Sequence, residues 1–179
     1  MGPSKTLWAF FLWGLLSFVS LPFIHHFEEA YYLKKEPFFT CPVPSQYNLA
    51  PLRNDTFGKG YFGASRNGGR THEGIDLLGR VGDPVFAAKS GRVMRVERST
   101  KGYGQLIEIG HPNGLSTIYA HLSKIDIKTH DWIKQGSLIG KTGKSGNAMN
   151  PKILPHLHFE VRDHQKSINP NQLISFKLA

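Results

Sequence analysis

The sequence predicts an all-β domain, a small antiparallel β-sheet or sandwich with a groove. Three observations support this. After residue 45, short apolar runs alternate with polar residues at the two-residue period of a strand. The 19 glycines and 11 prolines are scattered rather than clustered, as expected where many turns separate short strands. Helical periodicity in this region is confined to a short stretch near the C-terminus. At 179 residues the chain has room for one such domain and an appendage.

The first element is an N-terminal segment, residues 1–24, whose part from 7 to 24 contains no charged side chain. Eighteen residues as a helix span about 27 Å, close to a bilayer's hydrocarbon core, so we predict an uncleaved transmembrane anchor. Lys5 precedes the segment and Glu28 and Glu29 follow it, which places the remaining chain outside the cytoplasm. A cleaved signal peptide remains an alternative, although no Ala-x-Ala-type site follows. Both alternatives export the domain.

Residues 25–50 are predicted to be a connector. A short helix extends towards Lys35 and ends at Glu36-Pro37, because a residue before proline disfavours the helical conformation. The single cysteine, Cys41, excludes an intrachain disulfide, and nothing around it resembles a lipid-attachment site. The domain itself is assigned to residues 51–179.

Within the domain, the alternating pattern and the turn residues predict a series of short strands. Pro112-Asn113-Gly114 marks the turn of a hairpin. Residues 143–155 form a long loop leading into His156, and long loops beside a candidate site often form its walls. The predicted strands are residues 85–88, 91–97, 105–109, 115–122, 132–140 and 156–161.

The formal charge of +9 lies entirely on the domain, because residues 1–50 carry three basic and three acidic side chains and residues 51–179 carry 19 and 10. A basic surface favours an anionic partner such as nucleic acid, anionic lipid or an acidic wall polymer. The sequence contains no nucleic-acid recognition motif, and export would separate the domain from nucleic acid. We therefore predict no nucleic-acid partner.

Two short stretches carry metal-ligand chemistry. His72 and Asp76 are four residues apart with Gly74 between them, and imidazole with carboxylate suits zinc. His156 and His158 lie at the two-residue spacing that puts both on one face of a strand. Two histidines, an aspartate and a further nearby histidine would form a metal site with one open position. Spacing alone does not decide which of His156 and His158 binds the metal.

The order and spacing of several motifs resemble those of the lysostaphin-type, LytM-like zinc metallopeptidases. The resemblance covers residues 57–172 and is carried by these segments: His72-x-Gly-Ile-Asp76, Gly82-Asp83-Pro84-Val85-Phe86-Ala87, Gly91-Arg92-Val93, Tyr119-Ala120-His121-Leu122, Gly136-Ser137-Leu138-Ile139-Gly140, His156-Leu157-His158-Phe159-Glu160 and Ile168-Asn169-Pro170. It implies a groove domain of the duplicated hybrid motif-like type with one zinc ion. The implied activity is hydrolysis of peptide bonds in the stems or cross-bridges of bacterial cell-wall peptidoglycan.

Transferred position by position, the resemblance implies that His72, Asp76 and His158 are the zinc ligands. It implies that His121 and His156 are catalytic residues facing the zinc-bound water, the nucleophile, without binding zinc themselves. Our hypothesis makes His156 the general base and His121 the group that stabilises the oxyanion. The reverse assignment stays open, and equal pH profiles in His156→Ala and His121→Ala variants would defeat either one.

Other residues and functions are left with alternatives. Arg66 and Arg70 either pair with substrate carboxylates or are solvated loop charges, and Tyr119 lies either in the groove or in the core. A non-cleaving peptidoglycan-binding or regulatory module of the same fold is the alternative function, although the ligand set is complete. The predicted location is the bacterial cell envelope, anchored in the cytoplasmic membrane, or secreted if the N-terminal segment is cleaved. The sequence leaves open whether an activating protein partner is needed and does not identify one.

Overall fold

The computed structural model describes residues 30–44 and 51–175. The chain divides into two compact units at the boundary between Pro37 and Phe38. In the first unit residues 30–35 are helical, and the helix ends before Glu36-Pro37 as the sequence predicts. Among the described residues no helix is both long enough and apolar enough to cross a membrane. The predicted anchor over residues 7–24 lies outside the described residues.

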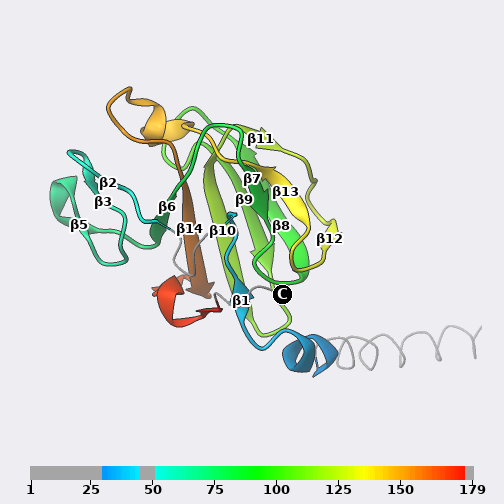
Figure 1. The fold of residues 1–179 in the computed structure, drawn as a ribbon. Coiled ribbons are helices and arrows are strands. Elements are labelled where there is room, and N and C mark those ends of the chain that lie inside the picture. The colour runs from blue at the N-terminus through cyan, green and yellow to red at the C-terminus, as the bar shows by residue number, and fades with distance from the viewer. Residues whose placement is uncertain (1–29, 45–50, 176–179) are drawn as a thin grey trace, which may run out of the picture. The chain divides into compact units, whose positions relative to one another are not determined.

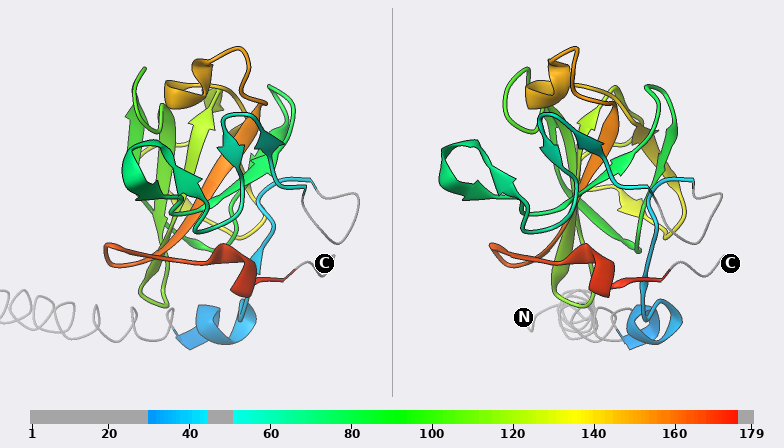
Figure 2. Two further views of the ribbon diagram at one scale, coloured as in Figure 1. Left: turned by 90° about the vertical axis from the view of Figure 1, so that its left-hand side faces the viewer. Right: turned by 60° about the vertical axis from the view of Figure 1, so that its left-hand side comes forward.

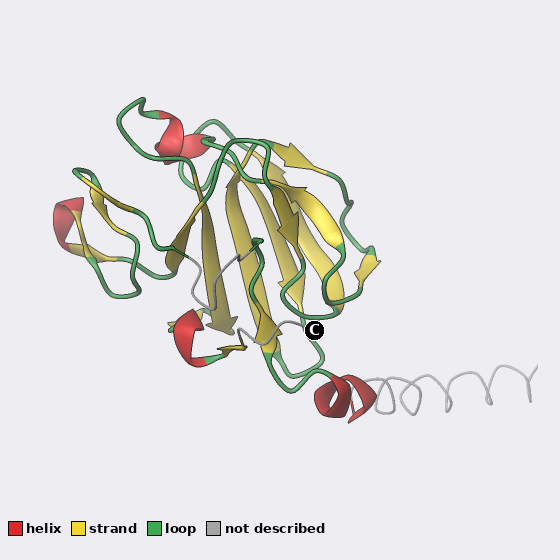
Figure 3. Cartoon of the chain, in the orientation of Figure 1, coloured by secondary structure: helices red, strands yellow, loops and turns green. Residues whose placement is uncertain are grey.

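The second unit is built on a seven-stranded sheet in which every pairing is antiparallel (Figure 1). β6 joins the sheet by pairing with β14. The strands, in sheet order, are β12 (Trp132–Ile133), β8 (Gly91–Arg98), β9 (Gln105–Gly110), β10 (Leu115–Leu122), β14 (His156–Asp163) and β15 (Lys166–Ile168), with β6 (Ile75–Leu78) beside β14. The predicted β architecture is confirmed, and strands dominate the described chain (Figure 3).

Smaller sheets and turns complete the unit. A three-stranded antiparallel sheet contains β11 (Lys124–Ile125), β13 (Leu138–Lys141) and β7 (Pro84–Phe86). β1 (Phe39–Thr40), from within the predicted connector, pairs in parallel with β16 (Ile174–Ser175). Two short hairpins pair β2 (Asn54–Asp55) with β3 (Gly58–Lys59) and β4 (Ser65–Arg66) with β5 (Arg70–Thr71). The described helical turns of the domain are the 3₁₀ segments η1 (Asn67–Gly69), η2 (Gly146–Met149) and η3 (Pro170–Gln172).

The hydrophobic core lies between the seven-stranded and three-stranded sheets. Val85 and Ile139, from β7 and β13, are fully buried in the same cluster as Leu157 and Phe159 of β14. Tyr119 also belongs to this cluster, and its hydroxyl accepts a hydrogen bond from the Ala88 amide at 2.8 Å. Of the two alternatives for Tyr119, the core is therefore the correct one.

The alternation along β14 separates the core from a polar face. Leu157 and Phe159 enter the core, while His156, His158 and Glu160 point to the opposite side, where they line a cleft. Figure 2 shows the segment from β2 to β5 and the loop that carries η2 projecting from the sheet. Residues of both segments, together with the polar face of β14, line that cleft.

Residues 51–53, which precede β2, pair with the edge of β6. The Leu78 amide donates to the Pro51 carbonyl at 2.7 Å, and the Arg53 amide donates to the Asp76 carbonyl at 2.9 Å. A bridge between Leu52 and Leu77 continues this pairing. Residues 51–53 therefore run along the free edge of β6, next to the candidate metal ligand on that strand.

Candidate metal centre

The register between β6 and β14 brings Asp76 directly opposite His158. His72 lies just before β6, and the intervening chain passes against the backbone of β14. A Cβ atom at Gly74 would collide with the carbonyl oxygen of Phe159, so only glycine permits this approach. The glycine between the two predicted ligands is thus needed for a close contact with the neighbouring strand.

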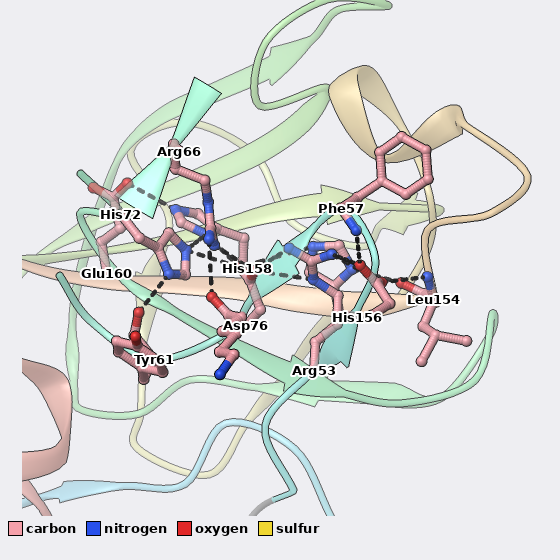
Figure 4. A network of polar contacts seen from close by, with 12 residues as sticks. Arg53, Phe57, Tyr61, Arg66, His72, Asp76, Leu154, His156, His158 and Glu160 are labelled. Carbon is pink, nitrogen blue, oxygen red and sulfur yellow. Dashed lines mark hydrogen bonds and ion pairs between the residues drawn. The ribbon is translucent and has the colours of Figure 1, made fainter. Parts of the chain in front are cut away.

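His72, Asp76 and His158 form a compact, buried cluster (Figure 4). The Asp76 Oδ1 atom is 3.0 Å from His72 Nε2 and 2.8 Å from His158 Nδ1, and the two nitrogens are 3.0 Å apart. Tetrahedral zinc with bonds of about 2.0–2.1 Å separates its ligand atoms by about 3.3 Å. The three residues that the resemblance implies as ligands therefore have a spacing that a zinc ion fits after small adjustments.

Hydrogen bonds outside the cluster orient both imidazoles for metal binding. His72 Nδ1 donates to the Tyr61 carbonyl at 2.9 Å, and His158 Nε2 donates to Glu160 Oε1 at 2.8 Å. In the neutral tautomers these bonds leave the lone pairs on the two nitrogens that face Asp76. Two lone pairs and a carboxylate oxygen then face one another, an arrangement that a bound cation would stabilise.

Without a cation, protonation of His158 relieves this repulsion. Burial disfavours the charged imidazolium, but hydrogen bonds and charge interactions with Asp76 and Glu160 raise the pKa of His158 to about 9. Burial also opposes ionisation of Asp76, yet its close contacts with the imidazoles of His158 and His72 hold the pKa of that carboxyl far below its usual range. Asp76 is therefore ionised throughout the physiological pH range.

Two arginines bind the other oxygen of Asp76. Arg53 Nε and Nη2 lie 3.1 and 3.0 Å from Asp76 Oδ2, and Arg66 Nη2 lies 3.0 Å from the same atom. Of the two alternatives for Arg66, neither substrate pairing nor a solvated charge describes it, because it pairs with Asp76. Arg70 is exposed and lines the cleft.

His121 and His156 lie beside the cluster. His156 Nε2 is 3.8 Å from Asp76 Oδ1, and the centre of the His121 ring is 5.1 Å from that of His156 and 5.8 Å from that of His158. His121 lies at a register shift of β10 with a φ of 61°, a left-handed conformation that is uncommon for histidine. This irregularity ends the regular strand where its histidine reaches the cleft.

Both of these histidines are held neutral and in the same tautomer. Burial lowers the pKa of His121 to about 3, with a further contribution from His158, and lowers that of His156 to about 4. Their Nδ1 atoms donate to the carbonyls of Ser145 and Leu154, at 2.9 and 2.7 Å. The lone pair of each is thus on Nε2, and each ring is able to accept a proton at neutral pH.

The five predicted site residues, His72, Asp76, His121, His156 and His158, all line one cleft of about 660 Å³. Glu160, which was not predicted as a site residue, is fully buried and accepts hydrogen bonds from Tyr103 and Arg162, both at 2.7 Å. Glu160 is two residues after His158, so the same strand alternation would have placed it on the metal face. No comparable sequence signal pointed to Arg53 or Tyr103.

Comparison with known proteins gives a consistent result. The sequence model of Peptidase family M23 matches residues 70–170. The murein hydrolase activator NlpD of Escherichia coli is 35% identical over 109 residues, which are 61% of this chain and 27% of NlpD. The matched region thus spans about a quarter of the length of that relative.

Solved structures also resemble this chain. A zinc-containing peptidase from Vibrio cholerae has a TM-score of 0.61 and 27% identity, covering 79% of this chain and 40% of that one. The catalytic domain of the antimicrobial peptidase lysostaphin from Staphylococcus simulans has a TM-score of 0.55 and 30% identity, covering 67% of this chain and 90% of that one. The predicted lysostaphin-type fold is confirmed.

Proposed function

Since the chain belongs to peptidase family M23, we propose that it is a zinc-dependent endopeptidase that hydrolyses peptide bonds in bacterial cell-wall peptidoglycan. The observation that carries this proposal is the coincidence of two arrangements in one cleft. His72, Asp76 and His158 present three ligand atoms to one point, and two neutral histidines lie beside them. A metal-binding role alone would not require the two additional imidazoles.

In this proposal His72 Nε2, Asp76 Oδ1 and His158 Nδ1 hold the zinc ion. Zinc supplies Lewis-acid polarisation of the scissile carbonyl and lowers the pKa of a water ligand towards about 7. His156, which is the nearer of the two additional histidines to Asp76, accepts a proton on Nε2 and returns it to the leaving amine. His121, after taking a proton from solvent on Nε2, would donate it in a hydrogen bond to the developing oxyanion. The two histidines share the same tautomer and neutrality, so the reverse assignment remains open.

The alternative is a non-cleaving module that binds peptidoglycan or regulates another enzyme. It is favoured by the similarity to NlpD, which is named as an activator of murein hydrolases. Similarity to lysostaphin and to the Vibrio cholerae protein, both named as peptidases, supports the enzymatic proposal. The complete set of five site residues in one cleft also supports cleavage.

The deciding experiment measures release of free amino groups from purified peptidoglycan by the zinc-loaded full chain. A His121→Ala variant is the matched control, because it removes an imidazole that is not a proposed ligand. Amine release by the wild type and not by the variant would establish peptidase activity, and the fragments would identify the bond. Absence of amine release from both proteins, with zinc bound, would reject cleavage by the isolated chain.

The cellular setting is part of the same proposal. We place the domain in the bacterial envelope, outside the cytoplasm, with peptidoglycan stems or cross-bridges as its partner. The proposed order is an anchor over residues 1–24, a connector over 25–50 and the peptidase domain over 51–179. Protease accessibility of the domain in intact spheroplasts would test this orientation.

A further inference from the structure

Arg53 bridges two carboxylates at the edge of the metal centre. Its Nε and Nη2 atoms contact Asp76 Oδ2, while its Nη1 atom lies 2.7 and 2.9 Å from the two oxygens of Asp55. The Arg53 side chain is only 5% exposed. All three of its nitrogens are therefore occupied by acids in a largely dehydrated position, where charge-assisted hydrogen bonds are strong.

Asp55 extends this contact to the loop before β14. The Leu154 amide donates to Asp55 Oδ2 at 3.1 Å, and the Leu154 carbonyl accepts from His156 Nδ1 at 2.7 Å. A continuous chain of hydrogen bonds thus runs from Asp76 through Arg53, Asp55 and Leu154 to His156, and Figure 4 shows this network from close by. It joins a predicted metal ligand to a predicted proton acceptor along the side of the cleft.

We propose that Arg53 is a positioning residue that restricts Asp76 to one metal-binding oxygen and, through Asp55 and Leu154, fixes the orientation of His156. The inference rests on the proposed function for its consequence in catalysis. Arg53 lies outside residues 70–170, the part matched by the family model. The metal centre of this chain is therefore completed by a segment that precedes the matched region.

The geometry explains why arginine is needed at this position. Two arginine nitrogens and Arg66 occupy Asp76 Oδ2, so Oδ1 alone faces His72 and His158. A lysine at position 53 would keep the positive charge, but its single nitrogen lacks the planar fork that bridges two carboxylates. Loss of the fork would leave Asp76 Oδ2 with Arg66 as its remaining arginine partner, which would let this oxygen turn to the metal as a second ligand atom, and it would release Asp55 from its partner.

The first test uses Co²⁺ as a spectroscopic probe in the full chain, comparing Arg53→Gln and Arg53→Lys with the wild type. If the proposal is correct, the visible absorption of Co²⁺ shifts and weakens in both variants, because a second oxygen raises the coordination number. Arg53→Lys keeps the charge at this buried position and carries the test if Arg53→Gln does not fold. Arg95→Gln is the matched control, since Arg95 pairs with Glu97 and Glu108 on the exposed face of β8.

The second test measures amide hydrogen exchange of Leu154. In the wild type the Asp55 carboxylate protects this amide, although the residue lies in an exposed loop. Arg53→Lys should accelerate its exchange because Asp55, the acceptor of this amide, loses its own partner. The Leu115 amide, which donates to Asn113 Oδ1, is the internal control and should be unchanged.

Where the wild type cleaves peptidoglycan, kcat should fall about 10- to 100-fold in Arg53→Lys, the usual effect of removing a residue that orients a metal ligand. KM should change little, because Arg53 holds groups of the site rather than substrate. Co²⁺ spectra that superimpose on the wild type, together with unchanged exchange at Leu154, would overturn the proposal. If the spectra and exchange change while the wild type cleaves nothing, the positioning role stands and the proposed peptidase function fails.

Discussion

Zinc binding to this site should be limited by competition with a proton. His158 has its pKa raised to about 9 when no metal is bound, because its imidazolium form donates to Asp76 and Glu160. Zinc at the cluster requires the lone pair of His158 Nδ1, so the proton must leave. Below pH 9 the apparent zinc affinity should therefore fall as the pH falls.

The magnitude follows from the distance between the pKa and the working pH. At pH 7 the site lies about two units below the pKa of His158, so the apparent affinity is about 100-fold lower than that of the fully deprotonated site, or about 2.7 kcal/mol. The same pKa shift also makes the stability of the metal-free fold depend on pH. A pKa raised from 6.5 to about 9 on folding stabilises the metal-free fold fully below pH 6.5, and this contribution is lost as the pH rises through about 9.

Calorimetric titration of zinc into the full chain, in buffers of different ionisation enthalpy, counts the protons released. We expect about one proton at pH 7 and about a quarter of a proton at pH 9.5. Glu160→Gln is the informative variant, because it removes a carboxylate that raises the pKa of His158 and should move the release to lower pH. Zinc affinity independent of pH between 7 and 9, with no proton released, would refute this account of the site.

Three further predictions concern single residues. His121→Ala and His156→Ala should each reduce peptide cleavage by about 10²–10⁴-fold. The zinc content of both variants, measured by atomic spectroscopy, should stay at one ion per chain. Loss of zinc in either variant would contradict the placement of these histidines outside the ligand set. Tyr119→Phe should lower the free energy of unfolding by about 1–3 kcal/mol, because the buried Ala88 amide loses its acceptor. Urea titration of the metal-free protein measures this change, and an unchanged midpoint would refute the role of the hydroxyl. Gly74→Ala should weaken zinc binding, because the added Cβ collides with a backbone carbonyl of β14. Competition with a chromophoric chelator measures the affinity, and a value equal to that of the wild type would refute this reasoning.

Local patterns in the sequence were sufficient to predict most of the fold. Alternation and turn residues placed the strands that became β8, β9, β10, β13 and β14, because these features depend on neighbouring residues alone. The small hairpins β2–β3 and β4–β5 and the strand β6 were not predicted, since they lie in or beside a stretch dense in turn residues and show little periodicity. Their existence depends on pairing partners elsewhere in the chain.

The sequence also determined which residues compose the candidate site. Residue type and spacing singled out His72 with Asp76, and His156 with His158 on one strand face, while the motif resemblance assigned their roles and the role of His121. The structure brings all five to one cleft.

Only the tertiary structure decided how these residues are held. The contact between Asp76 and His158 depends on the register of β6 against β14, which joins positions 82 residues apart. The position of Arg53 depends likewise on pairing along the outer edge of β6. A sequence records the period of each strand but not which residues of distant strands lie opposite each other, because register is set by packing of the whole sheet.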